Sequence, residues 1–83
     1  MPTVAIVEGV KIQLFVQEHP PPHFHAVFAE YRAQIDIRTL HVLRGSLPPA
    51  KLAAVISWAE TRREALMSAW DAACAKQKPE KIR

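Results

Sequence analysis

The feature that most constrains the fold is a pair of strand-like runs, 24–28 and 31–37, separated only by Ala29 and Glu30. A two-residue connection between such runs is typical of a tight antiparallel hairpin. Antiparallel pairing across this turn sets three pairs of residues opposite one another: Phe28 and Tyr31, His25 and Gln34, His23 and Asp36. A slip of one residue would turn the polar side chains inward, so burial specifies this register.

The two faces of this hairpin differ sharply in polarity, because successive side chains of a strand point to opposite sides. One face carries Phe24, Ala26, Phe28, Tyr31, Ala33, Ile35 and Ile37. The other carries His23, His25, Val27, Arg32, Gln34, Asp36 and Arg38. We therefore expect Phe24 and Ile35 to be buried, and His23 and His25 to project together from the opposite side.

Further strands are predicted on both sides of the hairpin. Thr3–Val7 is short and β-branched, and Lys11–Glu18 alternates apolar and polar residues with a period of two. Leu40–Leu43 is predicted to form a short edge strand that closes at Gly45. The sequence thus predicts an antiparallel meander of four to five strands.

The C-terminal part predicts one long helix from Ala50 to about Ala75, since it lacks internal Gly and Pro and is rich in helix formers. Apolar residues recur there every three or four positions, as on a helix that covers a sheet. The predicted fold is therefore α+β, with one domain over residues 1–75 and a basic flexible tail over 76–83. A helix of this length spans about 39 Å and a seven-residue strand about 23 Å. The helix must overhang the sheet or kink.

A strip of small residues on the predicted helix surrounds one tryptophan. The strip consists of Ala54, Trp58, Ala65, Ala69 and Ala72. Such a strip suits the close approach of a second helix, and tryptophan is a common interface anchor. If the helix overhangs, we expect a homodimer through Trp58. If it kinks, Trp58 is expected under the sheet edge.

Charge and cysteine content bound the class of protein. The net charge is +3, and residues 76–83 alone contribute +3, so residues 1–75 are neutral overall. No apolar run is long enough to cross a membrane, and the start of the chain lacks the basic and apolar regions of a signal peptide. The single cysteine, Cys74, excludes an internal disulfide. We expect a cytoplasmic protein.

Three of the four histidines lie within seven residues, in the segment His19-Pro-Pro-Pro-His23-Phe24-His25. One interpretation is a metal site: His23 and His25 offer two ligands for zinc or another divalent metal, and His19 or Asp36 a third. No cofactor is expected otherwise. A second interpretation is structural, with the rings bonding to the backbone, to one another or to a partner protein.

The third interpretation is metal-free acid–base chemistry on RNA. Two imidazoles suit it because one ring can donate a proton while the other accepts one, and Asp36 can orient the ring of His23. Arginines on the same face can hold a phosphate. The catalytic candidates are His23, His25, Asp36 and Arg32, and the binding candidates are His19, Lys11, Gln34 and Arg38.

Several of these motifs together resemble a family of small bacterial proteins, domain of unknown function 4160. The resemblance rests on the Pro-Pro-His23-Phe24-His25 core, the Glu30-Tyr31 turn, Ile35-Asp36-Ile37, Leu47-Pro48 and Trp58-Ala59-Glu60. The chain departs from the family pattern at Ala29, where glycine is expected, and in having three consecutive prolines. The resemblance implies a second small partner protein and a toxin–antitoxin-like gene pair, without an assigned activity.

These observations lead to two hypotheses of different classes. The first is a toxin-type component that binds, and as a ribonuclease cuts, RNA through the face that carries His23 and His25. The alternative is a non-enzymatic protein-interaction module, or a metal-binding module, in which the histidines are structural or ligating. Growth arrest on expression, relieved by substitution of these histidines, separates the first from the second.

Overall fold

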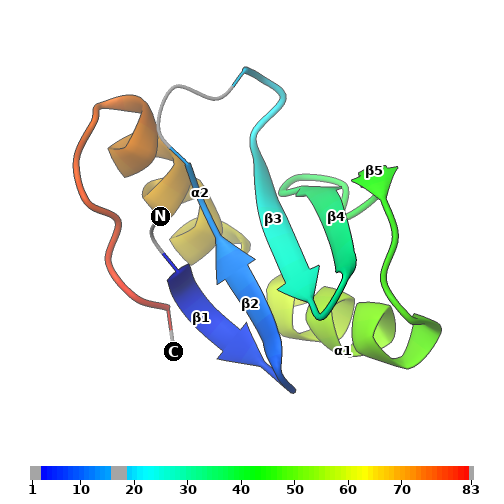
Figure 1. Cartoon of the computed structure of the whole chain (residues 1–83). Helices are drawn as coiled ribbons and strands as arrows, with labels where there is room; N and C mark the ends of the chain where they lie inside the picture. The colour runs from blue at the N-terminus through cyan, green and yellow to red at the C-terminus, as the bar shows by residue number, and fades with distance from the viewer. Residues whose placement is uncertain (1–2, 16–18, 83) are drawn as a thin grey trace.

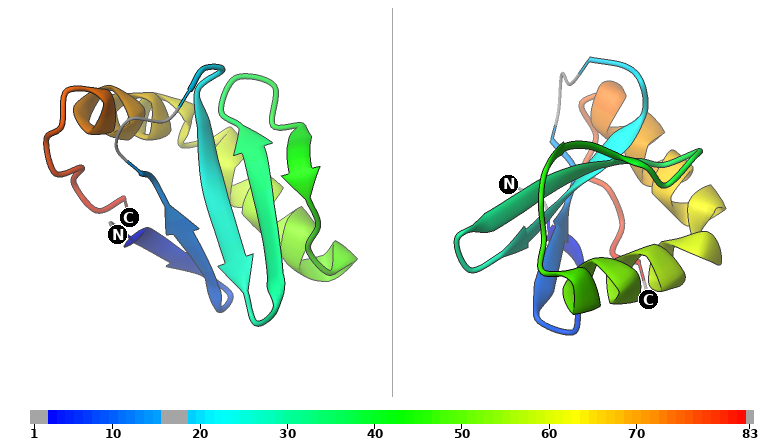
Figure 2. Two further views of the ribbon diagram at one scale, coloured as in Figure 1. Left: turned by 45° about the horizontal axis from the view of Figure 1, so that its top comes forward. Right: turned by 90° about the vertical axis from the view of Figure 1, so that its right-hand side faces the viewer.

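The computed structural model describes residues 3–15 and 19–82, which form one five-stranded antiparallel sheet and two helices (Figure 1). The strands follow the chain in the order β1-β2-β3-β4-β5. Their bounds are β1 Thr3–Val7, β2 Val10–Gln13, β3 His23–Phe28, β4 Tyr31–Asp36 and β5 Val42–Gly45. The helices are α1 Pro49–Glu60 and α2 Arg63–Cys74. Both helices lie on the same face of the sheet, which confirms the α+β meander (Figure 2).

The central hairpin, β3 and β4, has the predicted register. Phe28 pairs with Tyr31, His25 with Gln34 and His23 with Asp36. The predicted core face is confirmed at Phe24 and Ile35, which are fully buried. The connection turns at Ala29, whose φ of 52° lies in the left-handed region. Glycine adopts that region without the steric cost that a Cβ brings, so alanine here strains the turn.

β2 and β5 differ most from the predicted strands in their bounds. β2 ends at Gln13, and Leu14 and Phe15 continue outside the strand, while residues 16–18 of the predicted run lie outside the described part of the chain. β5 begins at Val42 rather than Leu40. The reason is a tight loop after β4, in which the Leu40 N–H donates to the Asp36 carbonyl oxygen at 2.8 Å. Leu40 has a φ of 62°, which breaks the extended conformation.

The prediction of one long helix is wrong, because the chain breaks between α1 and α2 at Thr61 and Arg62. A straight helix over this stretch would span about 39 Å. The Cα atoms of the protein extend only 33 Å along the longest axis. The break lets the apolar sides of both halves reach the sheet, where Val55, Leu66 and Trp70 are buried.

Side chains at the break bond to the freed end of α1. Arg62 donates from a guanidinium nitrogen to the Trp58 carbonyl oxygen at 2.9 Å, and the Thr61 hydroxyl donates to the same oxygen at 3.4 Å. The Arg62 guanidinium also lies 5.3 Å from the centre of the Trp58 ring. Trp58 is half-buried against the core. The overhang from which a homodimer was predicted is thus absent, and the homodimer stays a prediction.

The C-terminal segment after α2 returns to the sheet (Figure 1). The Ile82 N–H donates to the Val4 carbonyl oxygen of β1 at 2.7 Å, and Pro79 is buried. The basic side chains Lys76, Lys78 and Lys81 remain exposed. The flexibility predicted for residues 76–83 stays a prediction. Neither helix of the described chain has the length and apolar content that a membrane span needs.

Candidate functional site: the open sheet face

The face of the sheet turned away from both helices, called the open face here, carries two rows of side chains across the strands, and the buried pair His23 and Asp36 lies at one end of it. Residues paired across antiparallel strands point to the same side, so the register defines each row. The first row is Thr3, Gln13, His25, Gln34 and Arg44. The second row is Ile6, Lys11, Val27 and Arg32.

The charges on these two rows are all positive. Lys11 of β2, Arg32 of β4 and Arg44 of β5 are exposed, and neither row contains a carboxylate. Residues 1–75 are neutral overall, so this face has a local excess of positive charge that the composition conceals. Such a patch attracts anions even on a neutral body.

A hollow of about 450 Å³ lies on the open face beside β5. Its lining includes Phe15, His25, Arg32, Gln34 and Arg44. These side chains come from β3, β4, β5 and the segment after β2, so residues distant in sequence share one small surface. The hollow joins two guanidinium groups, an amide and two rings, which can bind a phosphate and a flat base together.

Gly45 and a bulge place Arg44 in this hollow. The β4–β5 register shifts between Gln34 and Ile35, so Arg44 pairs with Gln34 and Val42 pairs with Ile35. Gly45 has a φ of 76°, and a Cβ there would collide with the Arg32 carbonyl oxygen. Glycine is therefore required at position 45, directly after Arg44, because the backbone of β5 lies so close to that of β4 there.

Four aromatic rings connect the hollow to the core, in the order Phe15, His25, His23 and Trp70. The Phe15 and His25 centroids are 4.5 Å apart and edge to face. His23 lies 5.2 Å from His25 and 5.2 Å from Trp70 of α2. Because β2 ends opposite His25, no strand residue of β2 pairs with His23, and the ring of Trp70 approaches it instead.

His23 is a buried side chain, with only 5% of its surface exposed. Its Nδ1 lies 2.8 Å from the Pro21 carbonyl oxygen. A carbonyl oxygen only accepts, so Nδ1 carries the hydrogen in this contact. His23 and His25 do lie together, as predicted, but only His25 lines the hollow.

Asp36 is also buried, at 8% exposure, and its carboxylate organises the loop after β4. Its Oδ1 accepts from the backbone N–H of Arg38 at 2.7 Å and of Thr39 at 3.0 Å. An Asx turn of this kind fixes the chain direction at a strand end. Asp36 is the register partner of His23, as expected. The two hydrogen bonds of its Oδ1, however, go to the backbone of the loop that follows β4.

Arg38 does not share the open face, which corrects its predicted position. β4 ends at Asp36, so the alternation on which that position was based stops before Arg38. Arg38 instead borders a hollow of about 510 Å³ beside α2, together with Arg63, Glu64 and Asp71. Lys11 and Gln34, by contrast, lie where the sequence predicts them, on the open face.

His19 is exposed in the segment before β3. Among residues 3–15 and 19–82, no group of three or more His, Cys, Asp or Glu side chains lies close enough to hold a metal ion. Zinc in proteins takes three or four ligands. His23 and His25 provide two rings, and the His23 Nδ1 is engaged by the Pro21 carbonyl oxygen, so metal binding at this pair stays a prediction.

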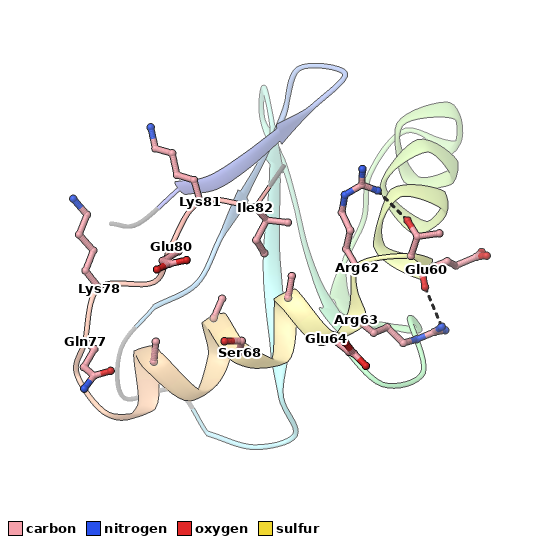
Figure 3. A pocket seen from close by; sticks show the side chains of 14 residues that line it. Glu60, Arg62, Arg63, Glu64, Ser68, Gln77, Lys78, Glu80, Lys81 and Ile82 are labelled. Carbon is pink, nitrogen blue, oxygen red and sulfur yellow. Dashed lines mark hydrogen bonds between the residues drawn. The ribbon is translucent and has the colours of Figure 1, made fainter.

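A larger hollow lies elsewhere, between α2 and the C-terminal segment (Figure 3). Its volume is about 760 Å³, and small side chains of α2 such as Ala65 and Ala69 line it. Charges of both signs surround it: Glu60, Glu64 and Glu80, with Arg62, Arg63, Lys78 and Lys81. This mixture does not favour a polyanion, so the smaller hollow on the open face is the better candidate site.

Sequence reasoning missed Arg44 and Phe15 as site residues. Alternation within a strand identifies Lys11, Gln34 and Arg32, but Arg44 reaches its row only through the bulge in the β4–β5 pairing. Gly45 directly after a strand-like run was the available signal, since glycine in a strand often marks a bulge or a close backbone approach.

Comparison with known proteins identifies a family. The family described as Domain of unknown function (DUF4160) has a model that matches residues 9–71. That range contains β2 to β5, α1 and most of α2, and therefore every residue that lines the hollow on the open face. No curated protein and no solved structure matches the chain.

Proposed function

The chain belongs to the family described as Domain of unknown function (DUF4160), and from its open face we propose that it binds single-stranded RNA. The observation that carries the proposal is the set of three exposed cations, Lys11, Arg32 and Arg44, on rows that contain no carboxylate. When Lys and Arg side chains contact phosphates, the counterions condensed on the nucleic acid are released, and this release drives binding.

The spread of the cations suits an extended strand. β2 and β5 are separated by three inter-strand spacings of about 4.8 Å, or about 14 Å in all. Lys11 and Arg44 mark the two ends of this span, and Arg32 lies between them on β4. A chain of phosphates that crosses the strands can contact all three in turn.

Aromatic side chains in the hollow support a single strand rather than a duplex. Phe15 and His25 are half-buried and lie at the hollow. Unpaired bases stack on such rings, and each stacked base contributes about 1–3 kcal/mol. Gln13 and Gln34 stand beside His25 in the same row and can donate to or accept from base edges.

We expect binding rather than cleavage by two histidines. Acid–base cleavage with two imidazoles needs both rings at the substrate. His25 lines the hollow, whereas His23 is buried between His25 and Trp70. The structural role of the alternative hypothesis therefore fits His23, and the substrate contact fits His25.

A toxin-type role in a two-gene pair is the further part of this proposal. It rests on the family resemblance together with the RNA-binding face. Expression of the chain is expected to slow growth, and the double variant Arg32→Ala/Arg44→Ala to relieve the effect. Unchanged growth with the wild-type chain at high expression would contradict this part and leave the RNA-binding proposal standing.

The test of RNA binding is fluorescence anisotropy with a labelled twelve-nucleotide single strand, at several salt concentrations. Lys11→Ala, Arg32→Ala and Arg44→Ala are each expected to weaken binding, and to reduce the slope of log K against log salt by about 0.7 per lost phosphate contact. Lys78→Ala, on the exposed C-terminal segment, is the matched control. Loss of binding in Lys78→Ala, with none in the three face variants, would contradict the proposal.

A further inference from the structure

The two edges of the sheet differ in what lies beside them. The outer edge of β1 is covered by the C-terminal segment of the same chain, through the hydrogen bond from Ile82 to Val4. β5 forms the other edge, and β4 is its only strand neighbour in the described sheet (Figure 1). All four residues of β5 are exposed. An exposed strand edge is a template for pairing with another chain.

The hydrogen-bond pattern identifies which backbone groups of β5 face outward. The Ser46 N–H donates to the Arg32 carbonyl at 2.9 Å, and the Asp36 N–H donates to the His41 carbonyl at 2.9 Å. Antiparallel pairs alternate between bonded and non-bonded, and each non-bonded residue points its N–H and C=O away from the partner. By this alternation Val42 and Gly45 present their backbone groups to the outside.

The side chains of β5 define the sequence that would pair with it. Val42 shares the helix-covered side with Ile35 and is 38% exposed, while Arg44 shares the open face with Gln34. Leu43, in the bulge, is 42% exposed. Residues 38–46 contain two arginines and His41 but no carboxylate. A neighbouring strand would therefore place apolar side chains beside Val42 and acidic side chains beside Arg44.

We propose that β5 binds an extended segment of a partner protein in which apolar and acidic residues alternate, so that this segment becomes a sixth strand of the sheet. Backbone hydrogen bonds supply affinity in such complexes, and pockets for alternate side chains supply specificity. The hollow lined by Arg32 and Arg44 is the pocket on the open side. A second copy of β5 fits less well, because the facing strand would bring a further Arg44 and no carboxylate to this edge.

Such a partner would also control access to RNA. An acidic side chain of the partner that pairs with Arg44 would prevent this arginine from contacting an RNA phosphate, so the partner segment and the RNA would compete. This consequence rests on the proposed RNA binding, whereas the pairing at β5 does not.

The test is an amide-resolved NMR titration of the full chain with a capped eight-residue peptide of alternating valine and glutamate. We expect shifted and exchange-protected amides at Val42 and Gly45, with β1 unchanged. The matched probe, alternating valine and lysine, is expected to bind at least tenfold more weakly. Absence of binding at millimolar peptide, equal binding of the two peptides, or shifts confined to the helices would each overturn the proposal.

A charge exchange at Arg44 sharpens the test. Arg44→Glu is expected to reverse the preference, so that it binds the lysine peptide and loses the glutamate peptide. Lys11→Glu lies on the open face but away from β5; it is expected to keep the glutamate preference while weakening RNA binding. Edge pairing that survives without RNA binding would overturn the RNA proposal alone. An Arg44→Glu chain that folds, by its amide spectrum, yet still prefers the glutamate peptide would overturn the edge proposal alone.

Discussion

His23 and His25 stand two residues apart on β3, point to the same side and differ in almost every other respect. His23 is buried, contacts Trp70 of α2, and bonds to the Pro21 carbonyl. His25 is half-buried, meets the edge of the Phe15 ring, and lines a hollow with Arg32 and Arg44. The two rings touch each other, with centroids 5.2 Å apart.

The difference arises from the end of the neighbouring strand. His25 has Gln13 of β2 as its partner, so it stands in a complete row across the sheet. His23 lies beyond the end of the β2–β3 pairing, and the Trp70 ring of α2 approaches it there. His23 thus contacts α2 through Trp70, and His25 is the ring that we propose meets the RNA.

The largest expected effect concerns Phe15 and Trp70, the two outer members of the series of four contacting rings. Trp70→Ala is expected to lower the free energy of unfolding by about 3–5 kcal/mol, because a nearly buried indole is lost from the core. Phe15→Ala is expected to cost about 1 kcal/mol, because its ring is only half-buried. Urea denaturation measures both. Equal losses of unfolding free energy in the two variants would show that the Phe15 and Trp70 ends of the series do not differ in burial as described.

The next largest effect is expected on substitution of the two histidines, where one variant mainly loses stability and the other mainly loses RNA affinity. His23→Ala is expected to lower the free energy of unfolding by about 2 kcal/mol, through lost packing and the lost hydrogen bond to the Pro21 carbonyl, and to change RNA affinity little once the variant is folded. His25→Ala is expected to cost less than about 1 kcal/mol and to weaken RNA binding several-fold. Denaturation and anisotropy on the same preparations supply the measurements.

A conservative variant controls for the hydrogen bond of His23. His23→Asn retains a side-chain donor that can reach the Pro21 carbonyl, so it is expected to recover part of the lost stability. A folded His23→Ala chain that loses RNA binding as fully as His25→Ala would show that both rings act on the ligand.

The smallest effect concerns the turn that joins β3 to β4. Ala29→Gly is expected to raise the free energy of unfolding by about 1 kcal/mol, because glycine adopts the φ of 52° without strain. The substitution touches neither ring, so RNA affinity is expected to stay constant. A thermal melt and one anisotropy titration test both halves, and destabilisation would mean that the turn differs from the one described.

Local pattern in the sequence predicted the sheet and much of the open face. Period-two alternation gave the β3–β4 register, the burial of Phe24 and Ile35, and the positions of Lys11 and Gln34. These features depend on residues close in sequence, for which side-chain periodicity is a direct physical consequence of strand geometry.

The errors share a different physical origin. The break at Thr61 and Arg62 follows from the size of the sheet that the helices cover, which no local signal such as Gly or Pro reports. Arg44 reaches the hollow through a bulge between distant strands, and Arg38 leaves the open face because β4 stops at Asp36. The burial of His23 depends on Trp70, which is 47 residues away in sequence and on another layer.

Binding of a single RNA strand to the open face can be followed by mapping the contact on the folded protein. Amide shifts are recorded while a ten-nucleotide single-stranded RNA is added. We expect shifts at Lys11, His25, Arg32, Gln34 and Arg44, with the helices and residues 76–82 unchanged. Shifts confined to the basic C-terminal segment, or to the hollow between α2 and that segment, would contradict it.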